Sequence, residues 1–106
     1  MPLHACPTDA FHAAPSRVWD ALTLPREMEK WIELRILDGP ARALEAGDRL
    51  VLGGALGRAI KVYFDIKEAE CPVRLALDVS LPLGIVNHEV IQITAMGPDQ
   101  CRVTFN

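Results

Sequence analysis

The sequence predicts an α+β domain in which two short helices follow the first strand and an antiparallel sheet is then built from successive hairpins. Residues 58–67 and 73–80 alternate apolar and polar side chains, and a break at Glu70-Cys71-Pro72 separates them. Strict alternation is typical of a strand with one buried face. Two such strands joined by a short turn form an antiparallel hairpin. Helical spacing of apolar residues, in contrast, is confined to residues 14–31.

The N-terminal third carries one expected strand and two expected helices. A first strand is expected within residues 3–13, where β-favouring residues occur. The first helix is expected over residues 14–22, because Pro15 suits the first helical position and the apolar residues that follow have helical spacing. The second helix is expected from Pro25 to Trp31, with Met28 and Trp31 on one face.

The remaining residues predict six strands in a meander. The expected strands are 34–44 (interrupted at Gly39-Pro40), 49–52, 58–67, 73–80, 85–95 and 101–105. The glycine-rich segment 53–57 precedes a strand and lacks the Gly-Lys-Ser/Thr of a phosphate-binding loop, so we interpret it as a tight connection.

Composition restricts the class of protein. Half of the 106 residues are hydrophobic, which excludes a disordered chain, and the length suits one domain. The net charge of -3 argues against nucleic acid as a partner. Three widely spaced cysteines give neither a disulfide framework nor a zinc site, and no metal or cofactor is expected. Since there is neither a signal peptide nor a membrane span, we expect a cytoplasmic protein.

Several short motifs, in order, resemble the START-related superfamily of polyketide cyclases, the birch-pollen allergen and lipid-transfer domains (SRPBCC). The motifs are Phe11-His-Ala-Ala-Pro-Ser-Arg-Val-Trp19, Pro25-x-x-Met28-x-x-Trp31, Leu44-Glu-Ala-Gly-Asp48, Ile66-Lys-Glu-Ala-Glu-Cys-Pro-Val-Arg-Leu75 and Gly97-Pro-Asp-Gln-Cys-Arg-Val-Thr104. The resemblance implies a helix-grip fold, a curved seven-stranded antiparallel sheet around a long C-terminal helix. Nothing after Phe105 can supply that helix, so we expect residues 1–106 to be one such domain that is truncated at its C-terminus.

The same resemblance implies a ligand cavity on the concave face of the sheet. The candidate ligand-binding residues are Trp31, Ile60, Val62, Phe64, Ile66, Leu75, Leu77 and Asn87. They favour binding of a small hydrophobic or amphipathic molecule such as a lipid, a polyketide or an aromatic metabolite. A concave apolar face without its helix also predicts a homo-oligomer that associates through this face.

Two other functions stay open at this point. One is a cyclase or dehydratase in which His12, His88 or Glu89 moves a proton. The helix-grip strand order predicts His12 and His88 roughly 10 Å apart. Alternation does not decide whether Asn87 and Glu89, or Val86 and His88, face the cavity. The other function is partner binding, with a helix of another protein in the open groove.

Overall fold

The computed structural model describes residues 8–53 and 60–105. Its helices and strands follow the chain in this order: β1 (Thr8–Phe11), α1 (Pro15–Thr23), α2 (Pro25–Met28), β2 (Arg35–Asp38), β3 (Arg49–Gly53), β4 (Lys61–Glu70), β5 (Arg74–Ser80), the 3-10 turn η1 (Pro82–Gly84), β6 (Val86–Gly97) and β7 (Gln100–Phe105). All strands belong to one antiparallel sheet with the order β1-β7-β6-β5-β4-β3-β2. The predicted α+β architecture, with two helices after the first strand, is confirmed.

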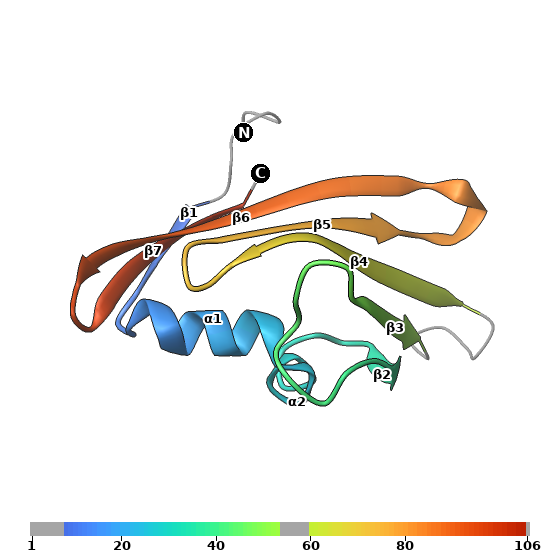
Figure 1. Ribbon diagram of the computed structural model, residues 1–106, viewed down its shortest axis with the longest axis horizontal. Coiled ribbons are helices and arrows are strands. Elements are labelled where there is room, and N and C mark those ends of the chain that lie inside the picture. The colour runs from blue at the N-terminus through green and yellow to red at the C-terminus, as the bar shows by residue number, and fades with distance from the viewer. Residues whose placement is uncertain (1–7, 54–59, 106) are drawn as a thin grey trace.

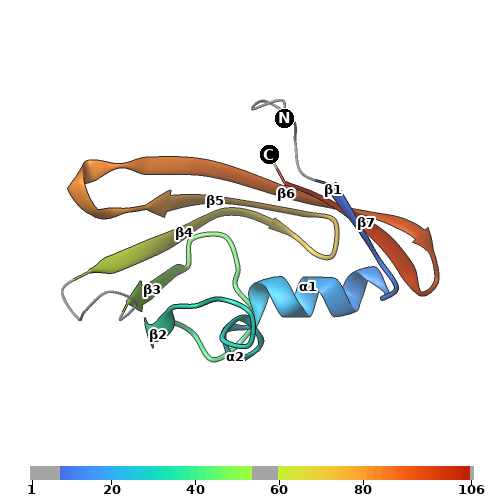
Figure 2. The same ribbon diagram turned by 180° about the vertical axis from the view of Figure 1, so that it is seen from behind.

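Both helices lie on one side of the sheet, which curves around them (Figures 1 and 2). Pro15 starts α1, because a proline at the first turn removes no helical hydrogen bond. Leu24 has extended backbone angles and ends α1, while the Thr23 hydroxyl donates to the Trp19 carbonyl at 2.7 Å. The second helix is shorter than predicted, because the chain leaves it at Met28 and reaches Trp31 through a turn. None of the helices in the described ranges is long and apolar enough to cross a membrane.

The core lies between the helices and the concave face of the sheet. Trp19 of α1 and Met28 of α2 pack there against side chains from five strands and the loop before β3. The buried apolar residues are Trp19, Met28, Leu44, Leu50, Leu52, Val62, Ile66, Leu75, Leu77, Ile93, Cys101 and Val103. The two short helices therefore cover much of the face that the sequence suggested would be open.

The predicted strand 34–44 is wrong in its second half. β2 ends at Asp38, and its register with β3 already shifts between Ile36 and Asp38. The Leu44 amide donates to the carbonyl of Thr23 at the end of α1, at 3.0 Å, instead of to a neighbouring strand. Leu44 is apolar because it is buried against the helices, and this explains why residues 41–44 were wrongly predicted as part of a strand. The glycine-rich connection and the start of the predicted strand 58–67 lie largely outside the described residues.

A row of charged side chains crosses the convex face of the sheet. Register places Arg49, Asp65, Asp78 and His88 side by side on β3, β4, β5 and β6. Arg49 binds both carboxylate oxygens of Asp65, at 2.6 and 3.1 Å, and His88 Nδ1 lies 2.5 Å from Asp78 Oδ1. Asp65 and Asp78 are direct cross-strand partners, so the positive charges of Arg49 beside Asp65 and of Lys67, 3.8 Å from Asp78, offset the repulsion between the two carboxylates.

Replacing Arg49 with glutamine is expected to destabilise the sheet, because Asp65 and Asp78 then face each other with less compensation. Hydrogen bonding to Arg49 lowers the pKa of Asp65, so the stabilisation is present above the usual aspartate pKa near 4 and is lost as pH falls through the lower folded value. The urea midpoint of the variant should be lower at pH 7, more so at low salt, and should approach that of the unmodified chain near pH 3. Arg102→Gln, an exposed change on β7, is the control; equal pH profiles for both variants would contradict the assignment.

Candidate functional site

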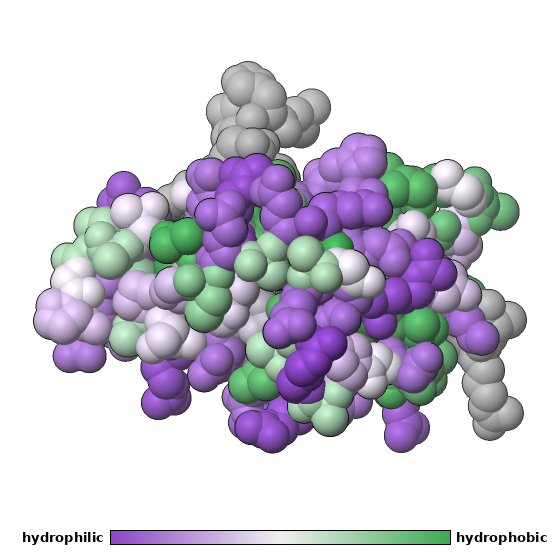
Figure 3. Space-filling model, in the orientation of Figure 1, coloured by the Kyte–Doolittle hydropathy of each residue, from purple (hydrophilic) through white to green (hydrophobic). Residues whose placement is uncertain are grey.

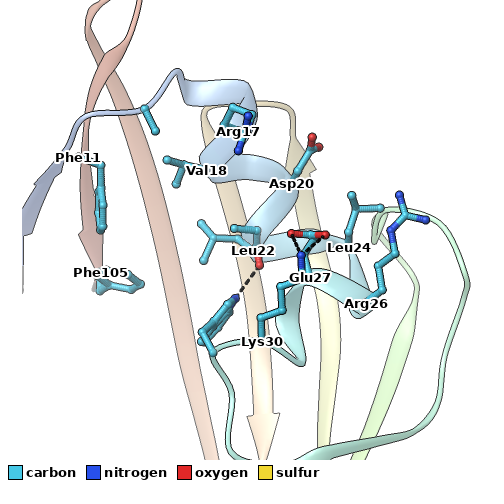
Figure 4. A pocket seen from close by; sticks show the side chains of 13 residues that line it. Phe11, Arg17, Val18, Asp20, Leu22, Leu24, Arg26, Glu27, Lys30 and Phe105 are labelled. Atoms are coloured by element: carbon cyan, nitrogen blue, oxygen red, sulfur yellow. Dashed lines mark hydrogen bonds and ion pairs between the residues drawn. The ribbon is translucent and has the colours of Figure 1, made fainter.

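A groove runs between α1, the segment after α2, and the edge of the sheet formed by β1 and β7. Its volume is about 710 Å³. Figure 4 shows Phe11 and Phe105 on the sheet side, facing Val18 and Leu22 on α1. The lining residues are Phe11, Ala13, Arg17, Val18, Asp20, Ala21, Leu22, Leu24, Arg26, Glu27, Lys30, Trp31 and Phe105.

Sheet pairing brings the two aromatic residues of the groove to one face. β1 pairs with β7 so that Phe11 lies opposite Cys101, and alternation along β7 puts Cys101, Val103 and Phe105 on the same face. On α1, Val18 and Leu22 are four residues apart and therefore share one side of the helix. An edge strand, a C-terminal strand and a helix thus supply the apolar walls.

Trp31 contributes an aromatic side chain whose orientation is held in place. Its indole N–H donates to the carbonyl of Ala21 at 2.7 Å. The side chain is 52% exposed, whereas Trp19 is only 4% exposed. Trp31 therefore offers an ordered ring to the groove, while Trp19 serves the core.

The rim of the groove carries charge of both signs. Lys30 and Glu27 pair with each other at 3.0 Å. In the described parts of the chain, the side chains of Arg17, Arg26 and Asp20 have no ion pair or hydrogen bond. Apolar walls under a charged rim suit a molecule with one apolar and one polar end. Within residues 8–53 and 60–105, no cluster of three or more His, Cys, Asp or Glu side chains is arranged to hold a metal ion.

The predicted ligand-binding residues fall into three environments. Trp31 lines the groove. Val62, Ile66, Leu75 and Leu77 are buried beneath the helices. The other three are more accessible: Phe64 and Ile60 are half-buried, and Asn87 is exposed on the face that carries the core.

The structure separates the three candidate catalytic residues. Glu89 lies opposite Leu77 and so points to the concave side, whereas His88 pairs with Asp78 on the convex side. His12 follows β1 near Gln100, whose side-chain nitrogen is 3.2 Å from the His12 ring. The predicted spacing of roughly 10 Å between His12 and His88 is wrong, because pairing aligns the end of β1 with Ala95, and His88 is about 23 Å further along β6.

Register also resolves which side of β6 faces inward. Asn87 and Glu89 lie opposite Val79 and Leu77, and Ile91 lies opposite Leu75. Asn87 and Glu89 remain exposed, and Phe64, Val79 and Ile91 are half-buried. We call Phe64, Val79, Asn87, Glu89 and Ile91 the concave strip, a set of inner-face side chains that are half-buried or exposed.

Most of the residues that line the groove were not predicted from the sequence. Phe11, Arg17, Val18, Leu22 and Phe105 were not among the candidate residues, although Val18 and Leu22 belonged to the predicted amphipathic helix. A signal was present in the expected pairing of the first and last strands, because this pair carries both Phe11 and Phe105. The missing information was the position of α1 relative to that pair.

Solved structures with a similar fold exist, although no family model matches the sequence and no curated protein matches it significantly. CalU16 from Micromonospora echinospora is 20% identical, with a TM-score of 0.72 over 92% of this chain and 55% of that one. DynU16, from the dynemicin biosynthetic locus, is 18% identical, with a TM-score of 0.73 over 95% of this chain and 35% of that one. The Aha1 dimer from Colwellia psychrerythraea is 16% identical, with a TM-score of 0.73 over 94% of this chain and 71% of that one.

Identities this low show the fold alone. The chain spans 55% of CalU16 and 35% of DynU16, so both of these proteins are considerably longer. The sequence motifs and the structural similarity nevertheless agree on one architecture. The chain has a helix-grip-like α+β fold.

Proposed function

We propose that this chain binds a small amphipathic molecule in the groove between α1 and the β1–β7 edge. The observation that carries the proposal is the groove itself, because its volume of about 710 Å³ lies within the range of roughly 300–1,000 Å³ that is usual for ligand pockets. Its aromatic and aliphatic walls suit an alkyl chain or a ring, and its charged rim suits a polar end. The similarity to a protein from a biosynthetic locus fits a metabolite as the ligand.

A binding role is favoured over catalysis by the positions of the candidate proton donors. His12, His88 and Glu89 lie at different places on the sheet, and none of them lines the groove. General acid–base catalysis requires the catalytic groups within hydrogen-bond reach of one bound substrate. The cyclase or dehydratase alternative would therefore need a different set of residues.

The proposal is tested with decan-1-ol as a neutral probe and with two matched variants. Phe11→Ser removes an aromatic wall whose side chain is 41% exposed, and Leu83→Ser removes an apolar side chain outside the groove that is 96% exposed. Leu83 belongs to η1, between β5 and β6, and Figure 3 shows apolar side chains gathered at the end of this hairpin. Calorimetric titration should show saturable binding that is about tenfold weaker in Phe11→Ser and unchanged in Leu83→Ser.

Two results would contradict the proposed function. One is that neither decan-1-ol nor decanoate binds saturably to the unmodified chain. The other is that Phe11→Ser keeps full affinity while its thermal melting shows that it is folded.

The concave strip supports a second candidate function, association with another protein surface. Half-buried apolar side chains there lie beside the exposed polar groups of Asn87 and Glu89, which is the composition of a small interface. The fold is shared with a protein described as an HSP90 activator from Plasmodium falciparum and with the Aha1 dimer. Both comparisons make partner binding, or self-association through this face, a specific alternative.

Self-association through the strip predicts that Ile91→Lys lowers the molar mass measured by light scattering. Ile91 is the residue of the strip that lies beside the groove, since it lies opposite both Leu75 and the groove residue Phe105. Thr94→Lys, on the opposite face of β6, is the control. A chain that is monomeric at micromolar concentration, with no response to either variant, would exclude a homo-oligomer through this face.

A further inference from the structure

We propose that the ligand of the groove carries an acidic group and that Arg17 binds it. This inference rests on the proposed function and adds the chemical class of the ligand: an apolar body with one carboxylate or a similar anion. The guanidinium of Arg17 would be the specificity-determining group. Arginine suits this role because its planar fork can donate two parallel hydrogen bonds to one carboxylate.

The position of Arg17 places its charge next to the apolar walls. Arg17 precedes Val18 in the first turn of α1, and both residues line the groove. Figure 4 shows Arg17 near the end of the helix closest to Phe11, whereas Arg26 extends from α2 on the far side, beside Leu24. A chain lying between the two phenylalanines and α1 would thus end within reach of Arg17.

The charge balance of the rim favours an anion. Lys30 and Glu27 neutralise each other. The other charged residues among the described lining residues have no partner, and they are two arginines, Arg17 and Arg26, and one carboxylate, Asp20. The chain as a whole has a net charge of -3, so the rim has the opposite sign to the molecule. A local excess of positive charge beside an apolar groove attracts negatively charged ligands selectively.

Arg17 differs in its pairing state from three other arginines, two on the sheet and one in the loop before β3. Arg42, Arg49 and Arg74 each bind a carboxylate within the chain. Arg17 keeps all its donors available at the groove, within the part of the chain that the structure describes. A carboxylate of the ligand would therefore not have to displace an existing ion pair.

The test compares decanoate with decan-1-ol, which share their alkyl chain and differ in charge at pH 7. The unmodified chain should bind decanoate about tenfold more tightly than decan-1-ol at low salt, a preference that shrinks as salt increases. Arg17→Gln should remove most of this preference, measured as the ratio of the decanoate and decan-1-ol affinities of the same variant. Arg102→Gln, an exposed arginine on the convex side of β7, should keep the preference.

The outcomes separate the two proposals. Equal affinity for both probes, or a preference for decanoate that persists in Arg17→Gln, overturns the assignment of Arg17 and leaves the groove as a binding site. Failure of both probes to bind overturns the proposed function and this inference with it. Loss of decan-1-ol binding in a folded Arg17→Gln variant would show a role in shaping the groove and would also overturn the proposal.

Discussion

Replacement of Trp19 with alanine is expected to lower the free energy of unfolding by about 3–5 kcal/mol, the usual cost of removing a large buried aromatic side chain. Trp19 is 4% exposed and anchors α1 in the core with Met28 and residues of the sheet. Because α1 covers the inner face of the sheet, loss of this anchor exposes apolar surface beyond the cavity itself. Urea denaturation followed by circular dichroism measures the change.

The matched control is Trp31→Ala, which removes the same side chain from an exposed position. Trp31 is 52% exposed and makes one hydrogen bond, to the Ala21 carbonyl. Its replacement should cost about 1 kcal/mol, mainly that hydrogen bond and partial burial. Equal costs for the two variants would contradict the assignment of one tryptophan to the core and the other to the groove.

Replacement of Gly39 with alanine is expected to destabilise the chain by about 1–3 kcal/mol through overpacking. A Cβ atom at Gly39 would collide with Cδ1 of Leu50, which is fully buried in β3 and has little room to move. The loop after β2 or the side chain of Leu50 would therefore have to shift. Thermal and chemical denaturation report the loss directly.

Gly97→Ala separates this contact from the backbone effect of losing a glycine. Gly97 has φ 158° and Gly39 has φ 159°, but a Cβ at Gly97 meets no atom within 4 Å. Gly97→Ala should therefore carry the backbone strain alone and destabilise the chain less than Gly39→Ala does. A similar loss of stability in both variants would show that the backbone, not Leu50, sets the cost.

The pattern of alternating residues predicted the hairpin of β4 and β5 because each strand has a buried and an accessible face. Register with β3 and β6 adds what alternation cannot provide, namely which neighbours share each face. Asn87 and Glu89 illustrate the difference: their strand was predicted, but only their pairing with Val79 and Leu77 places them on the concave side.

The errors have specific physical causes. Residues 41–44 imitate a strand because Leu44 is buried against the helices, and burial gives the same apolar signal in a loop as in a strand. His12 and His88 were expected to lie close together because the prediction took account of strand order but not of register. The observed register places His88 far along β6 from the residue that lies level with the end of β1. The groove depends on where a helix sits beside two paired strands, which no local pattern encodes.

The central claim is that the groove, not the covered core face, binds the ligand, and the two tryptophan indole N–H signals in a ¹H–¹⁵N NMR spectrum test it most directly. Trp31 lines the groove and Trp19 lies in the core. Titration with decanoate should shift the Trp31 signal progressively and to saturation, with a much smaller shift for Trp19. A larger shift for Trp19, or an unchanged Trp31 signal once decanoate is bound, would contradict the claim.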